Sequence, residues 1–173
     1  DELMRRVTSL INILGILVLM LVGCADEVKS DESIAEHYIE QNGYQVTSRK
    51  GEINQYILDK SKLYGSPEST PYLQSWDVQA VDPEKYFGKV ISVYLFTVKN
   101  HPLEEKYKRE TDVSVMICEG KVIGGTSFPV QEKELLLGAP YSLDGKTLEE
   151  VTRKSYQEWL ENWKIKYSNL LTN

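Results

Sequence analysis

The 173-residue sequence contains few residues of the types that build metal sites and disulfide frameworks. It has two cysteines, Cys24 and Cys118, and two histidines, His37 and His101. Neither histidine has a second histidine or a cysteine at metal-ligand spacing. The sequence therefore predicts no zinc site, and the fold must depend mainly on a hydrophobic core.

Several motifs that mark common enzyme and cofactor sites are also missing. There is no Gly-x-Ser-x-Gly elbow, no phosphate-binding loop and no dinucleotide fingerprint, so no cofactor is predicted. The segment 120–125 is glycine-rich, but it lies inside a predicted hairpin with no helix after it. It is therefore a poor cradle for phosphate.

Basic residues are fewer than acidic ones, and the net charge is −6. An acidic domain gains nothing from releasing counterions from phosphates, so nucleic acid is not an expected partner. Anionic head groups would repel it weakly, so charge alone would not hold it at a membrane. Any membrane attachment must come from another feature.

The N-terminus provides that feature. Met4-Arg5-Arg6 is followed by an almost wholly apolar, uncharged run over residues 7–22, which has the n-region and h-region pattern of an export signal. The run is shorter than the roughly 20 residues needed to span a bilayer. It ends in Leu21-Val22-Gly23-Cys24, which resembles the lipobox of bacterial lipoprotein precursors. An uncleaved signal anchor is the alternative, and Met4 is a candidate start site.

The resemblance implies cleavage between Gly23 and Cys24 and acylation of Cys24 by palmitate-type chains. Two acyl chains make a durable anchor, whereas one binds only marginally. Residues 25–30 form a polar tether that reaches at most about 20 Å. The expected organisation is a signal peptide (1–23), a lipidated cysteine with its tether (24–30) and one domain (31–173) outside the cytoplasmic membrane.

Cys118 would then have no partner in the chain. It ends the strand-like run 112–118, where a buried cysteine behaves as a small hydrophobe. A catalytic thiol, the alternative, would require a nearby histidine. We therefore expect a structural role for Cys118.

The mature part predicts an α+β fold with one antiparallel sheet of about five strands. A helix starts at Ser30 or Asp31 and stops at Asn42-Gly43, and residues 50–52 form a turn within a first hairpin. A helix over 53–63 is the competing prediction. Short helical turns are expected at 71–76 and 82–86, and 131–145 is expected to be a loop. The predicted strands are 44–49, 53–58, 89–99, 112–118 and 121–128.

The strand 89–99 is apolar on both faces, so it should be central. Gly124-Gly125 predicts a bulge or a close backbone approach in the last strand. The nearest architectures, by analogy, are cystatin-like and NTF2-like curved sheets, with the N-terminal helix on the sheet or at its edge.

A long C-terminal helix is expected to cover the sheet. Thr147 and Glu150 form a capping box, and the helix should run to about Asn169. Tyr156, Trp159 and Trp163 share one face, which indicates either a core-facing stripe or a candidate binding surface. Ile165 falls among the charged residues on the other face, which the helical pattern does not explain.

His101 ends the best strand and is the second candidate for a binding surface. The segment Glu119-Gly120-Lys121-Val122 is similar to the hairpin of the PepSY modules, which are propeptide-type inhibitors, and the chain resembles the small lipoproteins of Gram-positive bacteria. Membership there implies a location and no activity. We expect a non-catalytic module that binds an envelope protein or peptide. The alternative is an envelope-acting hydrolase using His101, or a PepSY-like or cystatin-like peptidase inhibitor.

Overall fold

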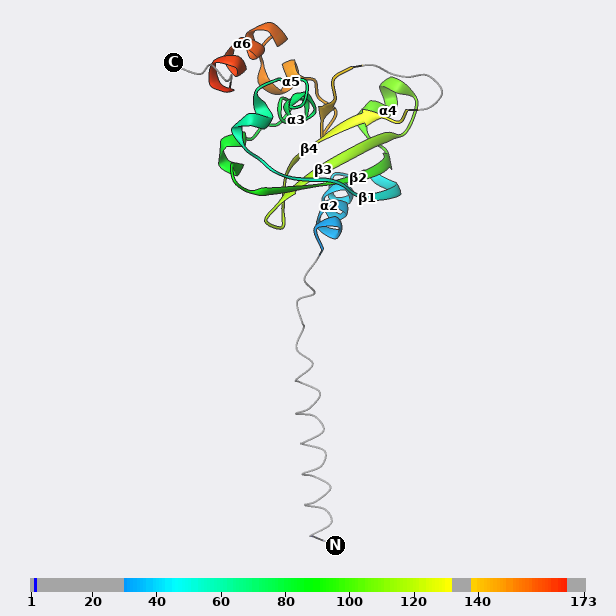
Figure 1. The fold of residues 1–173 in the computed structure, drawn as a ribbon. Coiled ribbons are helices and arrows are strands. Elements are labelled where there is room, and N and C mark those ends of the chain that lie inside the picture. The colour runs from blue at the N-terminus through cyan, green and yellow to red at the C-terminus, as the bar shows by residue number, and fades with distance from the viewer. Residues whose placement is uncertain (1, 3–29, 132–137, 168–173) are drawn as a thin grey trace.

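A computed structural model describes residue 2, residues 30–131 and residues 138–167 (Figure 1). The predicted signal peptide, Cys24 and most of the tether lie outside this range, as do residues 132–137 of the predicted loop and the last turn of the predicted C-terminal helix. No helix within these ranges has both the length and the apolar character needed to cross a membrane.

The α+β prediction is confirmed by a five-stranded antiparallel sheet in the order β1-β2-β3-β4-β5. Neighbours in the sequence are thus neighbours in the sheet. As predicted, β2 is interior, because it pairs with β1 on one side and β3 on the other. The strands are β1 (Gln45–Ile57), β2 (Val90–Lys99), β3 (Thr111–Cys118), β4 (Lys121–Pro129) and β5 (Tyr141–Ser142).

The predicted hairpin at 44–58 is wrong, because both of its strands belong to β1. Residues 50–52 continue the strand, which pairs with β2 along its whole length through three register shifts. Gly51 has a φ of +75° beside one of these shifts. A glycine with positive φ suits a bulge as well as a turn, which explains the error. The competing helix over 53–63 is also wrong, apart from a short 3-10 turn, η1 (Lys60–Leu63).

The fifth strand lies where a loop was predicted. β5 is only two residues long and pairs with Thr126 and Ser127 of β4. The glycine prediction in β4 is confirmed: a register shift separates the Val122 and Gly124 pairs. A Cβ on Gly125 would collide with the backbone oxygen of Ser114.

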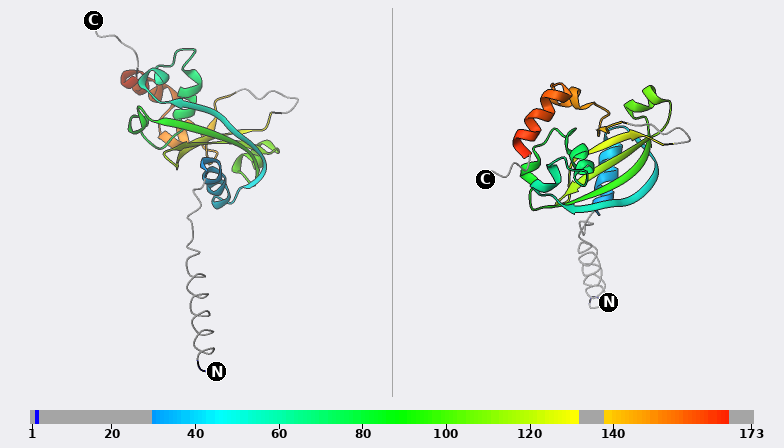
Figure 2. Two further views of the ribbon diagram at one scale, coloured as in Figure 1. Left: turned by 60° about the horizontal axis from the view of Figure 1, so that its bottom comes forward. Right: turned by 45° about the horizontal axis from the view of Figure 1, so that its top comes forward.

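Helix α2 (Asp31–Gln41) covers one face of the sheet (Figures 1 and 2). It begins as predicted, with the Ser30 hydroxyl accepting a hydrogen bond from the Ser33 N–H at 3.2 Å. Ala35 and Ile39 are fully buried against β2 and β3, where Phe96 and Val113 are also fully buried.

The opposite face is covered by η1, α3 (Thr70–Trp76) and η2 (Pro83–Tyr86), so both predicted short helical turns are confirmed. Trp76 is 1% exposed, and its indole N–H donates to the Tyr56 hydroxyl of β1 at 3.0 Å. This bond fixes α3 on the sheet.

The single C-terminal helix is corrected to two, α5 (Leu148–Thr152) and α6 (Tyr156–Tyr167). Arg153 stops α5 with a φ of +60°, and the Ser155 hydroxyl accepts from the Glu158 N–H at 3.3 Å. Ser155-x-x-Glu158 is itself a capping-box pattern, so the sequence did contain the signal for a second helix start. α6 packs on η1, and Tyr167 extends from it into the cluster that includes Tyr56 and Trp76.

Candidate functional site

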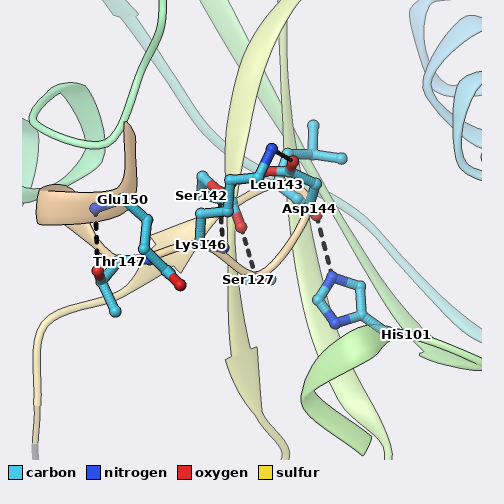
Figure 3. Close-up of polar contacts among 8 residues, drawn as sticks. All are labelled: His101, Ser127, Ser142, Leu143, Asp144, Lys146, Thr147 and Glu150. Atoms are coloured by element: carbon cyan, nitrogen blue, oxygen red, sulfur yellow. Dashed lines mark hydrogen bonds and ion pairs between the residues drawn. The ribbon is translucent and has the colours of Figure 1, made fainter. Parts of the chain in front are cut away.

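His101 is a buried structural residue. The residue is 2% exposed and directly precedes α4 (Pro102–Tyr107), a short helix. Nδ1 accepts from the Leu103 N–H at 3.2 Å, so Nε2 carries the proton and donates to the Leu143 carbonyl at 3.0 Å (Figure 3). Burial lowers the pKa of His101, which favours the neutral ring.

The surroundings of His101 do not form an apolar pocket. The adjacent hollow of about 860 Å³ is lined mainly by polar and charged side chains, including Asn100, Glu104 and Lys108. Because both ring nitrogens are engaged and the ring is buried, the structure gives no support to His101 as a surface ligand or a general base.

The turn after β5 is held by a compact hydrogen-bond network (Figure 3). The Ser142 hydroxyl donates to Asp144 at 2.5 Å and accepts from the Lys146 N–H at 2.9 Å, and Ser127 donates to the Ser142 carbonyl at 2.7 Å. The predicted capping box follows at once: Glu150 N–H donates to Thr147 Oγ1 at 3.2 Å. These bonds make one rigid wall.

That wall borders a groove of about 590 Å³. The other walls are the end of α2, the segment 78–81 and residues 122–124 of β4. The apolar side chains that line it come from the segment 78–81, from β4, from the turn after β5 and from α5: Val78, Val81, Val122, Ile123, Leu143 and Val151. We refer to this hollow as the β4 groove.

Gln79 defines the inner end of the β4 groove. Its Oε1 accepts from the Gly125 N–H at 3.0 Å, and its Nε2 donates to the Gly125 carbonyl at 2.8 Å and to the Ser75 carbonyl at 2.5 Å. The side-chain amide thus occupies the position of a neighbouring strand. No sequence signal pointed to Gln79, because a loop glutamine has no characteristic pattern.

The charged side chains that line the β4 groove differ in whether they are paired. Lys146 pairs with Asp144 at 2.5 Å, and a Glu150 carboxylate oxygen accepts from the Thr147 N–H at 2.7 Å. Arg153 is exposed, and no hydrogen bond or ion pair holds its guanidinium within the described ranges. It is therefore the free cation of the groove.

The predicted aromatic stripe divides into core and surface. Trp159 is 6% exposed and belongs to a buried cluster with Val78 and Leu148, as the core interpretation requires. Tyr156 is 52% exposed, and its ring centroid lies 6.0 Å from that of Trp159. Tyr156 and Trp163 line a pocket of about 310 Å³ between α3 and α6, which we call the α6 pocket.

Asp77 also lines the α6 pocket, although the sequence analysis did not single it out. It is 4% exposed, and burial raises the pKa of its carboxyl to about 7, with a smaller contribution from the charge of Glu149. An acidic residue at the C-terminal end of a predicted helix opposes the helix dipole, and this mismatch was the available signal.

The remaining chemistry in the described part of the chain is sparse. Cys118 is 3% exposed and burial raises the pKa of its thiol, which confirms a structural residue rather than a reactive one. Histidine, cysteine and acidic side chains form no cluster suited to a metal ion in this part.

Comparison of the chain with protein-family models, with curated proteins and with solved structures gave no match. The β4 groove and the α6 pocket are therefore the candidate binding sites.

Proposed function

We propose that this chain is a lipoprotein on the outer face of the cytoplasmic membrane and that its domain is a non-catalytic module binding an envelope protein or peptide. The single observation that carries the binding proposal is the unpaired edge of β4 beside a groove with a mixed apolar and polar lining. Beyond β4, β5 pairs only with Thr126 and Ser127, and Gln79 engages Gly125. Residues 122–124 line the groove without a further strand beside them in the described chain.

An extended polypeptide is the ligand that suits such an edge. Its backbone can add a strand to β4, while alternate side chains enter the β4 groove. Val122, Ile123 and Val151 line the groove and are half-buried, so they provide those apolar contacts. The free guanidinium of Arg153 favours a peptide that places an acidic side chain or a C-terminal carboxylate next to Arg153.

The proposed lipid anchor and the proposed peptide ligand imply the same location for the domain. A six-residue tether would keep the domain close to the membrane, so its partner should be an exported or membrane-bound polypeptide. The net charge of −6 gives the domain no attraction of its own to anionic lipid. Acylated Cys24 would then be the only membrane contact required.

The hydrolase alternative has less support. It relied on His101 as the base, but both nitrogens of that ring are hydrogen-bonded within the fold. A nucleophile with a base beside it is the minimum arrangement for such an enzyme. Binding needs only the β4 groove.

Site-specific photo-crosslinking in cells tests the proposal. A photoreactive amino acid in place of Ile123, in the groove, should give a discrete adduct with an exported polypeptide. The matched control is the same amino acid in place of Ile165, which is 82% exposed on α6. Equal adduct patterns from both positions, or none from Ile123, would refute groove binding.

A further inference from the structure

Asp77 occupies a position where the fold gives an acid no role. It is the residue that ends α3, where its own N–H bonds to the Leu73 carbonyl at 2.8 Å. Helix C-termini carry partial negative charge, so a carboxylate there is unfavourable. A capping function therefore does not explain this side chain.

The carboxyl group is also poorly satisfied. Asp77 Oδ1 is buried and has no hydrogen-bond partner among the residues that the structure describes, and the hydrogen bond that acts on the carboxyl comes from the Val78 backbone. Burial of an unpaired acid is costly, and native structures rarely keep one without a use. With the side chain 4% exposed and lining the α6 pocket, the pocket is where a partner would enter.

The walls of the α6 pocket are aromatic and apolar. Tyr64, Tyr156 and Trp163 contribute rings, and Leu73 and Leu160 contribute aliphatic surface. Trp163 is held in place, because its indole N–H donates to the Leu63 carbonyl at 2.9 Å and its ring packs 4.9 Å from that of Trp159. A fixed indole face is the best aromatic surface for a cation.

The charges around Asp77 favour a positive ligand. Glu149 of α5 acts on Asp77 with a like charge, which makes a second anion unfavourable there. Lys164 of α6 lines the pocket but is exposed, so its ammonium can turn into solvent. A bound cation would offset the buried carboxylate and contact the rings at once.

From this geometry we propose that the α6 pocket binds a small alkylammonium cation. The carboxyl of Asp77 supplies the opposite charge and the rings of Tyr156 and Trp163 supply cation–π contacts. A quaternary ammonium needs no directional hydrogen bond, which suits a carboxyl whose Oδ1 is buried. The α6 pocket is separate from the β4 groove, so a failure of peptide binding would not affect this proposal.

The test uses choline and its neutral analogue 3,3-dimethylbutan-1-ol, which has the same shape without the charge. Titration of the full chain is followed by the indole N–H signal of Trp163 in NMR spectra. Choline should shift this signal saturably and bind at least about tenfold more tightly than the alcohol. Asp77→Asn should remove most of that preference, whereas Glu161→Gln, an exposed acid on α6, should leave it unchanged.

The pH profile gives a second measurement that does not require a variant. Choline affinity should rise between about pH 6 and about pH 8 as the Asp77 carboxyl ionises; Glu149 and Lys164 are the other charged side chains near this carboxyl. Equal binding of the alcohol, no shift of the Trp163 signal, or undiminished choline binding by Asp77→Asn would each overturn the proposal.

Discussion

The Gln79 side chain binds both backbone groups of Gly125, at 3.0 Å to the N–H and 2.8 Å to the carbonyl. The Gln79 amide therefore takes the place of one residue of a further strand beside β4. It lies between the part of β4 that pairs with β5 and the part whose edge is unpaired in the described chain. The segment after α3 is tied to β4 by the same amide.

Replacing Gln79 by alanine should destabilise the domain. The Gly125 N–H and carbonyl would lose their partners in a half-buried position, which corresponds to about 1–3 kcal/mol in the free energy of unfolding. Urea unfolding measures the change. Gln157→Ala, on the exposed surface of α6, is the control and should stay within about 0.5 kcal/mol of the parent. A loss no greater than that of the control would show that the tie is unimportant.

Asp77→Asn should make the domain more stable at neutral and alkaline pH. In the folded protein the carboxyl has a pKa of about 7, raised from 3.8, so the folded state binds the proton more tightly than the unfolded state. The free energy of unfolding of the parent should therefore fall from about pH 4 to about pH 7, by up to about 4 kcal/mol, and then level off.

The asparagine variant should lack this fall. Thermal unfolding at a series of pH values compares the two proteins, with Glu161→Gln as the control. Because Glu149 and Lys164 are present in both proteins, the difference isolates Asp77. Parallel pH profiles for the parent and Asp77→Asn would contradict the account of a buried, unpaired carboxyl.

Ser155→Ala tests the division of the C-terminal segment into α5 and α6. Ser155 caps α6, so alanine should lower the free energy of unfolding by about 1 kcal/mol. In one continuous helix, alanine would instead be the better helix former and would stabilise the protein. The sign of the change in urea unfolding therefore distinguishes two helices from one.

The sequence predicted those elements whose signals are local. Ser30, Thr147 and Glu150 cap helices where expected, and the apolar faces of residues 89–99 identified the interior strand. Gly51 was misjudged because positive φ serves both turns and bulges, and only pairing with β2 decides between them.

The site was less predictable, because long-range contacts determine it. Gln79 meets Gly125 and His101 meets Leu143 only after the sheet has formed. Asp77 acquires its raised pKa from the burial that α6 and its neighbours impose. Residue type and spacing carry none of this information, whereas the proposed lipobox is a linear motif that can be recognised from the sequence alone.

Cys24→Ala should release the protein from the membrane if the lipobox is functional. The parent should partition into the detergent phase and carry an N-terminal mass that corresponds to acylated Cys24. The variant should keep its signal segment or lose the lipid mass, and cell fractionation with mass spectrometry measures both. Equal detergent partitioning and an uncleaved N-terminus in both proteins would contradict the lipoprotein proposal.

Binding in the β4 groove requires that an adduct formed from the groove depends on the groove remaining open. The anchored protein would carry a photoreactive residue in place of Ile123, with and without Val151→Arg, which places a long charged side chain in the groove. We predict one discrete adduct with an exported polypeptide and at least about a tenfold loss of it when Val151 is replaced. An adduct that is unaffected by Val151→Arg, or that forms equally from position 165, would contradict binding in the β4 groove.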